Sequence, residues 1–148
     1  MNIRFATPND IDFIVRANQE MALETEDKPL DQHTVRAGVS AVFQQKSETR
    51  YLIAEVDGNP VGNLMITKEW SDWRNGYFWW IQSVFIQSEY RRKGVYKRLH
   101  ANVKQLAKDN NACGLRLYVD KNNSIAQKTY ESLGMINTHY FLFEDDWS

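Results

Sequence analysis

The 148-residue sequence has only one cysteine, Cys113, and this scarcity limits how its fold can be stabilised. A single thiol excludes an intramolecular disulfide. The three histidines and Cys113 also lack the spacing of a structural zinc site, so we expect no metal. We interpret Cys113 as a small buried side chain that enters a strand.

The sequence also lacks long apolar runs and an excess of charge of either sign. No apolar run approaches the ~18 residues of a membrane-spanning helix, and charged residues stand where a signal peptide needs its apolar stretch. We therefore expect a soluble, cytoplasmic protein with no membrane partner. The net charge of -1 gives no overall attraction to nucleic acid, so we expect no nucleic-acid partner either.

Hydrophobic side chains are plentiful, at 43% of residues with 13% aromatic, which is ample for one two-layer core. Nothing in the composition suggests a linker between domains. The sequence therefore predicts a single domain over residues 1–148.

A stretch in the second half of the chain, Trp79 to Leu99, has the pattern of an anion site. Residues 79–86 are almost continuously apolar and predict a buried central strand. The basic loop Arg91-Arg92-Lys93-Gly94 follows. Apolar residues then recur at helical spacing from Val95. The N–H groups of this helix start, beside three cations and a glycine, are suited to a phosphate.

The rest of the chain predicts a mixed sheet. We expect a first strand over 2–6, a helix from the Thr7-Pro8-Asn9-Asp10 cap to about Leu23, and a second helix capped by Asp31. Further expected elements are strands over 50–56, 61–70, 77–86, 114–119 and 139–143, a helix from Val95, and a short helix over 124–133. The helix between strands 77–86 and 114–119 makes that pair parallel, whereas the earlier pairs are antiparallel. The fold class is therefore α/β, more narrowly an α+β mixed sheet.

Two motifs resemble the signatures of the GNAT superfamily of N-acetyltransferases. Arg91-x-x-Gly94-x-Tyr96 is similar to the acyl-CoA pyrophosphate loop, except that Tyr96 stands where the family has a small residue. The second motif resembles the downstream signature and consists of Asn123, Ala126, Tyr130, Gly134 and Met135. The resemblance extends over residues 50–136.

The resemblance implies a GNAT fold in which two parallel strands splay apart and acetyl-CoA, the co-substrate, fills the gap. Main-chain groups of Phe85, Ile86 and Gln87 would bind the pantetheine arm as an added strand would, and one nearby N–H would stabilise the oxyanion. The residues expected at the pyrophosphate are Arg91, Arg92, Lys93, Gly94, Val95, Tyr96 and Lys97. Asn123 would contact the arm or stabilise the loop before the short helix, and Ala126 and Tyr130 are also expected at the cofactor.

The implied reaction is direct attack by a primary amine in a ternary complex, with Tyr130 protonating the leaving thiolate. Many relatives have a basic Glu on the central strand, where this chain has Gln82 and Ser83. The amine would lose its proton through a chain of water molecules, with Tyr118 as a bridging hydroxyl. The sequence leaves open whether this chain ends at Glu24, at Glu26 or in bulk solvent. Because the acidic segment Glu24–Pro29 would border the acceptor pocket, we expect a small cationic acceptor.

Several alternatives remain. The chain could be a non-catalytic acyl-CoA-binding regulatory domain, or it could acetylate a protein N-terminus or a lysine. A nucleic-acid module is disfavoured by the balanced charge. A homodimer through the outer strands or the C-terminal segment is also expected.

Overall fold

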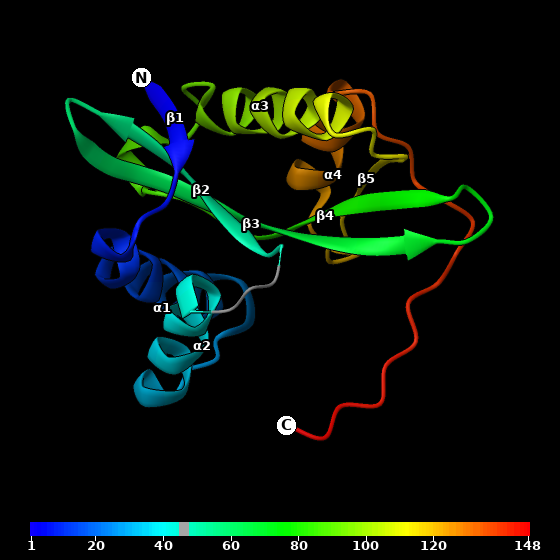
Figure 1. Ribbon diagram of the computed structural model, residues 1–148. Coiled ribbons are helices and arrows are strands. Elements are labelled where there is room, and N and C mark those ends of the chain that lie inside the picture. Colours follow the sequence, from blue (N-terminus) through cyan, green and yellow to red (C-terminus); the bar gives the residue numbers. More distant parts are fainter. Residues whose placement is uncertain (45–47) are drawn as a thin grey trace. The chain divides into compact units, whose positions relative to one another are not determined.

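The protein's structure is a computed structural model that describes residues 1–44 and 48–148 (Figure 1). The chain divides into two compact units, Met1–Leu117 and Tyr118–Ser148. The first unit contains the sheet and three of the α-helices, and the second contains a short helix and an extended C-terminal segment. A single domain over residues 1–148 stays a prediction.

A five-stranded sheet forms the centre of the first unit, with the strands in the order in which they occur along the chain. Its strands are β1 (Asn2–Phe5), β2 (Arg50–Val56), β3 (Asn59–Ser71), β4 (Gly76–Ile86) and β5 (Gly114–Arg116). The first three neighbouring pairs are antiparallel and β4 pairs with β5 in parallel, which confirms the predicted mixed sheet.

Helices cover both faces of this sheet, as Figure 1 shows. One face carries α1 (Ile11–Glu26) and α2 (Gln32–Gln44), and the other carries α3 (Val95–Asp109). Short 3-10 turns, Pro8–Asp10 and Ser88–Tyr90, precede α1 and α3. In the second unit, α4 (Ser124–Ser132) has almost the predicted bounds.

Alternating side chains of the strands divide the core into two layers. Leu52, Leu64 and Ile66 are buried with Leu99 and Val103 of α3. On the other face, Tyr51, Ile53 and Phe85 are buried with residues of α1 and α2, among them Phe13, Ile14, Val15 and Val39. Adjacent strand residues thus point into opposite layers, as the period of a β-strand requires.

A buried ion pair fixes the start of α1. Asp10 is 4% exposed, and it accepts two hydrogen bonds from the Arg4 guanidinium, at 2.8 and 3.0 Å, and one from Thr7 N at 2.8 Å. Burial alone would raise the pKa of Asp10, but the Arg4 and Thr7 bonds outweigh it, so the pKa is lowered. The predicted Thr7 to Asp10 cap is therefore part of a charged network that includes Glu55.

The C-terminal strand predicted over 139–143 is wrong, because these residues form no strand. Tyr140 to Phe143 have the aromatic composition of a strand, but β-structure also requires a neighbouring strand to accept its hydrogen bonds. The strand predicted over 114–119 is shorter than expected and ends at Arg116. Cys113, expected to be buried, is exposed, since it precedes β5 in the connection from α3.

Over the described ranges, no helix is both long enough and apolar enough to span a membrane.

Candidate active site

The outer edge of β4 opens where β5 ends. The two strands pair only at Phe78–Gly114, Trp79–Leu115 and Trp80–Arg116. β4 continues to Ile86, and within the described part of the chain no strand pairs with residues 81–86 on that side. The splayed parallel pair that the resemblance implied is therefore present.

Main-chain geometry shows which groups face this open edge. Gln87 N donates to Val61 O of β3 at 2.9 Å, so the main-chain groups of Gln87 face β3. Because these groups alternate along an antiparallel ladder, those of Ile86 face the outer edge. Arg91 Nε donates to Ile86 O at 2.8 Å, in agreement with this orientation. The Ile86 N–H is thus the candidate oxyanion donor at the end of β4.

The loop after β4 bends through two left-handed residues, Arg92 with φ 59° and Gly94 with φ 79°. Residues of this kind in a turn direct neighbouring N–H groups to one concave side, as in anion-binding nests. The first bond of the α3 start runs from Arg98 N to Gly94 O at 3.1 Å, so the N–H groups of the preceding turn lie ahead of the helical ladder. Arg92, Lys93 and Lys97 are exposed beside them.

Arg91 and Glu24, predicted as separate phosphate and acceptor contacts, are bonded to each other. Arg91 Nη2 lies 3.1 and 2.8 Å from the two Glu24 carboxylate oxygens, and the Arg91 guanidinium lies 5.9 Å from the centre of the Phe85 ring. The pair connects the end of α1 to the loop after β4. Glu26 is exposed near the end of the same helix.

Tyr96 packs against the core beneath α3, and its hydroxyl lies 3.2 Å from Nδ1 of His100, one helical turn later. This interaction places the Tyr96 side chain along the helix. His100 is 3% exposed, and burial, followed by the nearby charge of Lys104, lowers the pKa of its imidazole.

The other predicted residues of the first unit lie on β4. Gln82 is half-buried and accepts a hydrogen bond from Thr67 Oγ1 at 3.1 Å. The Phe85 side chain is buried under α1 and α2, and its main-chain groups face β3, as those of Gln87 do. Of the three residues predicted at the pantetheine arm, Ile86 therefore presents its main chain to the open edge, whereas Phe85 and Gln87 do not.

The predicted residues of the second unit lie on α4, at its N-terminal cap, or before it in the chain. Asn123 caps this helix, because its Oδ1 accepts from Ala126 N at 3.1 Å. Tyr130 is half-buried, and burial raises the pKa of its hydroxyl. Tyr118 is exposed.

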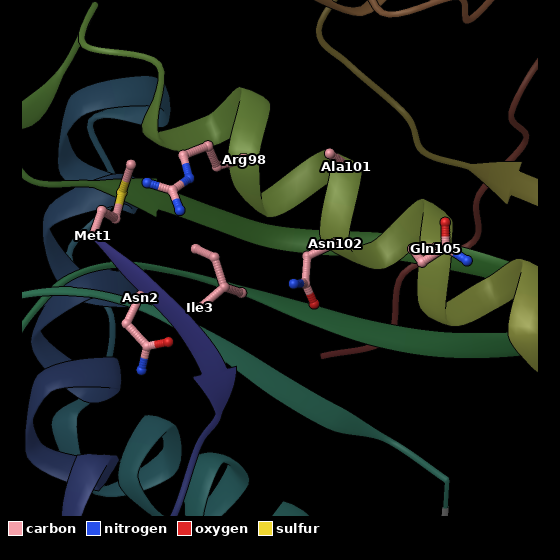
Figure 2. Close-up of a pocket in the computed structure, with 7 residues that line it drawn as sticks. All are labelled: Met1, Asn2, Ile3, Arg98, Ala101, Asn102 and Gln105. Atoms are coloured by element: carbon pink, nitrogen blue, oxygen red, sulfur yellow. The ribbon is translucent and has the colours of Figure 1, made fainter.

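An open hollow of about 420 Å³ lies between β1 and α3. Figure 2 shows Asn2 on one side and Arg98, Asn102 and Gln105 on the other. None of its lining residues is a predicted site residue. Within the described residues, no group of three or more His, Cys, Asp or Glu is placed to hold a metal ion.

Sequence reasoning missed Asn63, a buried amide opposite the end of β4. Its Nδ2 donates to Ser83 O at 3.1 Å, and Ser83 has a left-handed φ of 53°. The available signal was a strand-disfavoured asparagine inside the apolar run of β3.

Comparison with known proteins agrees with this geometry. The family model described as the acetyltransferase (GNAT) family matches residues 15–135. No curated protein matches the chain.

Three solved structures illustrate the range of related folds. A possible acetyltransferase from Clostridium difficile 630 is 43% identical, covers 98% of this chain and 96% of its own, and has a TM-score of 0.91. AAC(6')-Iy, solved with a CoA-containing bisubstrate analogue, is 17% identical, with 99% and 98% coverage and a TM-score of 0.78. A ribosomal-protein-alanine N-acetyltransferase from Brucella melitensis biovar Abortus 2308 is 16% identical, with 99% and 100% coverage and a TM-score of 0.76.

The last two structures share only the fold at this level of identity. The family model, however, matches most of the sequence, and the Clostridium difficile relative is similar over nearly its full length. The chain therefore belongs to the acetyltransferase (GNAT) family.

Proposed function

We propose that the protein transfers an acetyl group from acetyl-CoA to a primary amine of a small cationic molecule, by direct attack in a ternary complex. The observation that carries this proposal is the unpaired outer edge of β4, which leads directly into the cationic loop at the start of α3. Family membership supports acetyl-CoA as the acyl donor.

The two parts of this site suit the two parts of CoA. A pantetheine arm carries amides that can bond main-chain groups along Ile81–Ile86 as an added strand would. Its pyrophosphate suits the N–H groups around Gly94, with exposed Arg92, Lys93 and Lys97 supplying charge. Arg91 contributes through Ile86 O and Glu24, so it orders the junction between arm and loop.

The chemistry is one nucleophilic substitution at the thioester carbonyl. The amine lone pair forms the new C–N bond, the carbonyl oxygen takes up negative charge, and the C–S bond then breaks. The Ile86 N–H would stabilise that oxyanion. Tyr130 would give its proton to the thiolate. Burial raises the pKa of its hydroxyl and so makes the phenol a weaker acid, which means that the transfer would rely on the position of the hydroxyl relative to the thiolate. The proton lost by the amine leaves to solvent.

Calorimetric titration with acetyl-CoA tests the position of the site. Gly94→Asp adds bulk and negative charge to the loop, so we expect it to remove most of the binding. Gly58→Asp is the matched control, because Gly58 also has a left-handed φ, of 77°, and also has open space where a Cβ would be added. Equal affinity in folded Gly94→Asp and the parent would place acetyl-CoA elsewhere.

A panel of amines assayed by CoA release tests the acceptor. We expect small di- and polyamines to be acetylated faster than peptides with free N-termini or lysines. Glu26→Gln should raise KM for the amine about threefold, more at low salt than at high salt. Preference for a peptide would favour the protein-acetylating alternative, and tight acetyl-CoA binding without turnover would favour the regulatory one.

A further inference from the structure

A β-bulge interrupts β4 within residues 81–86, the part of the strand whose outer edge is open. Met65 pairs with Gln82 and Asn63 pairs with Phe85, so two steps along β3 correspond to three along β4. The additional residue lies at Ser83–Val84. Ser83 takes φ 53°, a left-handed conformation that side-chain-bearing residues seldom adopt.

The amide of Asn63 holds this bulge from the neighbouring strand. Asn63 is 1% exposed and lies between Ile53 and Phe85 in the register of the sheet, on the face covered by α1 and α2. Its Nδ2 donates to Ser83 O at 3.1 Å, supplying a bond to the bulged residue from a side chain. Among described residues, no donor reaches Asn63 Oδ1. The hydrogen bond from Nδ2 to Ser83 O is therefore the interaction that this buried amide makes with the bulge.

The bulge determines which main-chain groups face the open edge. Successive residues of a strand present their N–H and C=O groups to opposite edges, so one additional residue exchanges the two sets. Beyond the bulge, Gln87 faces β3 and Ile86 faces outward. The position of the Ile86 N–H therefore depends on the conformation of Ser83.

We propose that Asn63 is a positioning residue for acyl transfer, whose amide fixes the Ser83 bulge and thereby aims the Ile86 N–H at the thioester oxygen. This inference rests on the function proposed above. Asn63 acts through Ser83 and the strand, without touching the substrate. We expect its effect mainly on the chemical step, because the loop proposed to bind the CoA phosphates is also held from outside the strand, by the bond of Arg91 to Glu24.

Steady-state kinetics of Asn63→Leu test this role. Leucine keeps the size of the side chain and removes the donor, so we expect kcat to fall about tenfold while KM for acetyl-CoA changes less than about threefold. Ile66→Val is the control for destabilisation alone, since Ile66 is a buried core residue of the same strand. A kcat of folded Asn63→Leu within twofold of that of Ile66→Val would overturn the proposal.

Ser83→Gly in the Asn63→Leu background gives a second, independent result. Glycine adopts a left-handed φ without a side-chain penalty, so it should restore kcat by about threefold if Asn63 serves to hold that conformation. No recovery would contradict the proposed link through Ser83. If Asn63→Leu does not fold, Asn63→Thr, which shortens the donor, is measured against the same thresholds.

Amide hydrogen exchange separates this inference from the proposed function. In Asn63→Leu we expect the Phe85 amide to exchange at least tenfold faster than in the parent, with the Leu52 amide of β2 unchanged. This readout needs no turnover. A parent protein that neither binds acetyl-CoA nor releases CoA would refute the proposed function, whereas unchanged Phe85 exchange would refute the role of Asn63.

Discussion

Tyr130 is the residue on which the proposed proton transfer depends. A phenol with the usual pKa of about 10 is protonated at neutral pH, and burial raises the pKa of the Tyr130 hydroxyl further, so this group holds a proton that it can donate. Tyr130→Phe should lower kcat roughly 10²-fold with little change in acetyl-CoA affinity, the effect expected of a positioned general acid. Stopped-flow assay of CoA release gives kcat, and calorimetry gives the affinity.

The control for Tyr130→Phe is Tyr140→Phe, because Tyr140 is an exposed tyrosine of the same unit. If Tyr130→Phe turns over within twofold of the parent, the thiolate takes its proton from another group or leaves without one.

His100 is predicted to make stability depend on pH. Its pKa is lowered in the folded state by burial and by Lys104, so the unfolded chain binds a proton at pH values where the folded protein does not. The resulting stability is fully present above the pKa of the unfolded chain, about 6.5, and is lost as pH falls through the folded-state pKa. Melting curves between about pH 7 and pH 5 should show this loss in the parent and a smaller one in His100→Gln.

His33→Gln is the matched variant for that experiment, since His33 is exposed on α2. It should keep the slope of the parent. An equal slope in His100→Gln and the parent would assign the acid sensitivity to other groups.

At the scale of elements, Gly62 allows β3 to approach the end of β4 closely. A Cβ at this position would lie 2.7 Å from Ile86 Cδ1 and 3.0 Å from Phe85 O, and the second contact is with main chain. Gly62→Ala should therefore lower the free energy of unfolding by about 1–3 kcal/mol and raise KM for acetyl-CoA. Denaturant titration and kinetics measure the two effects.

Gly38→Ala provides the comparison, because an added Cβ there meets nothing within 4 Å. Gly38 lies on α2, where alanine is the better helix former, so we expect stabilisation by about 0.5–1 kcal/mol. A Gly62→Ala protein as stable as the parent would show that β3 and β4 can separate without loss.

The elements that sequence could predict are those whose signals are local. Asp31 was expected to cap a helix, and its carboxylate accepts a hydrogen bond from Thr34 N at 2.9 Å. Strand 139–143 was wrong because aromatic composition does not supply a pairing partner. The Arg91–Glu24 bond joins residues far apart in sequence, and no local pattern predicts which acidic residue an arginine will meet.

The candidate site likewise contains parts with a local sequence signal and a part without one. The Arg91 to Tyr96 loop and the strand before it could be predicted from sequence as a candidate site, because charge, glycine and apolar periodicity coincide there. The bulge at Ser83 was not, since it depends on a register that only the assembled sheet defines.

At the scale of the whole molecule, the C-terminal segment carries large apolar side chains in solvent. Phe141, Phe143 and Trp147 are 79%, 93% and 90% exposed. Aromatic side chains bury roughly 150–250 Å² each. If each of two copies buried these three side chains against the other, the total buried area would approach that of a stable protein–protein interface. We propose that a second copy covers them, and light scattering should give the mass of a dimer.

Phe141→Lys with Phe143→Lys should then give a folded monomer. The matched variant is Trp73→Lys, because Trp73 is 86% exposed in the β3–β4 turn and is a large exposed aromatic residue outside the C-terminal segment. A monomeric parent would contradict the dimer, and dissociation by Trp73→Lys alone would place the interface at that turn.

The open outer edge of β4 also bears on the protein's colloidal behaviour when no ligand is bound. Strand edges with unsatisfied main-chain groups template the addition of further strands, and this one is flanked by the apolar residues Ile81, Val84 and Ile86. An arm lying along that edge would occupy the same hydrogen-bonding groups. Acetyl-CoA should therefore slow precipitation of the protein on storage. Turbidity at equal protein concentration, with and without acetyl-CoA, would show how strongly the open edge drives self-association.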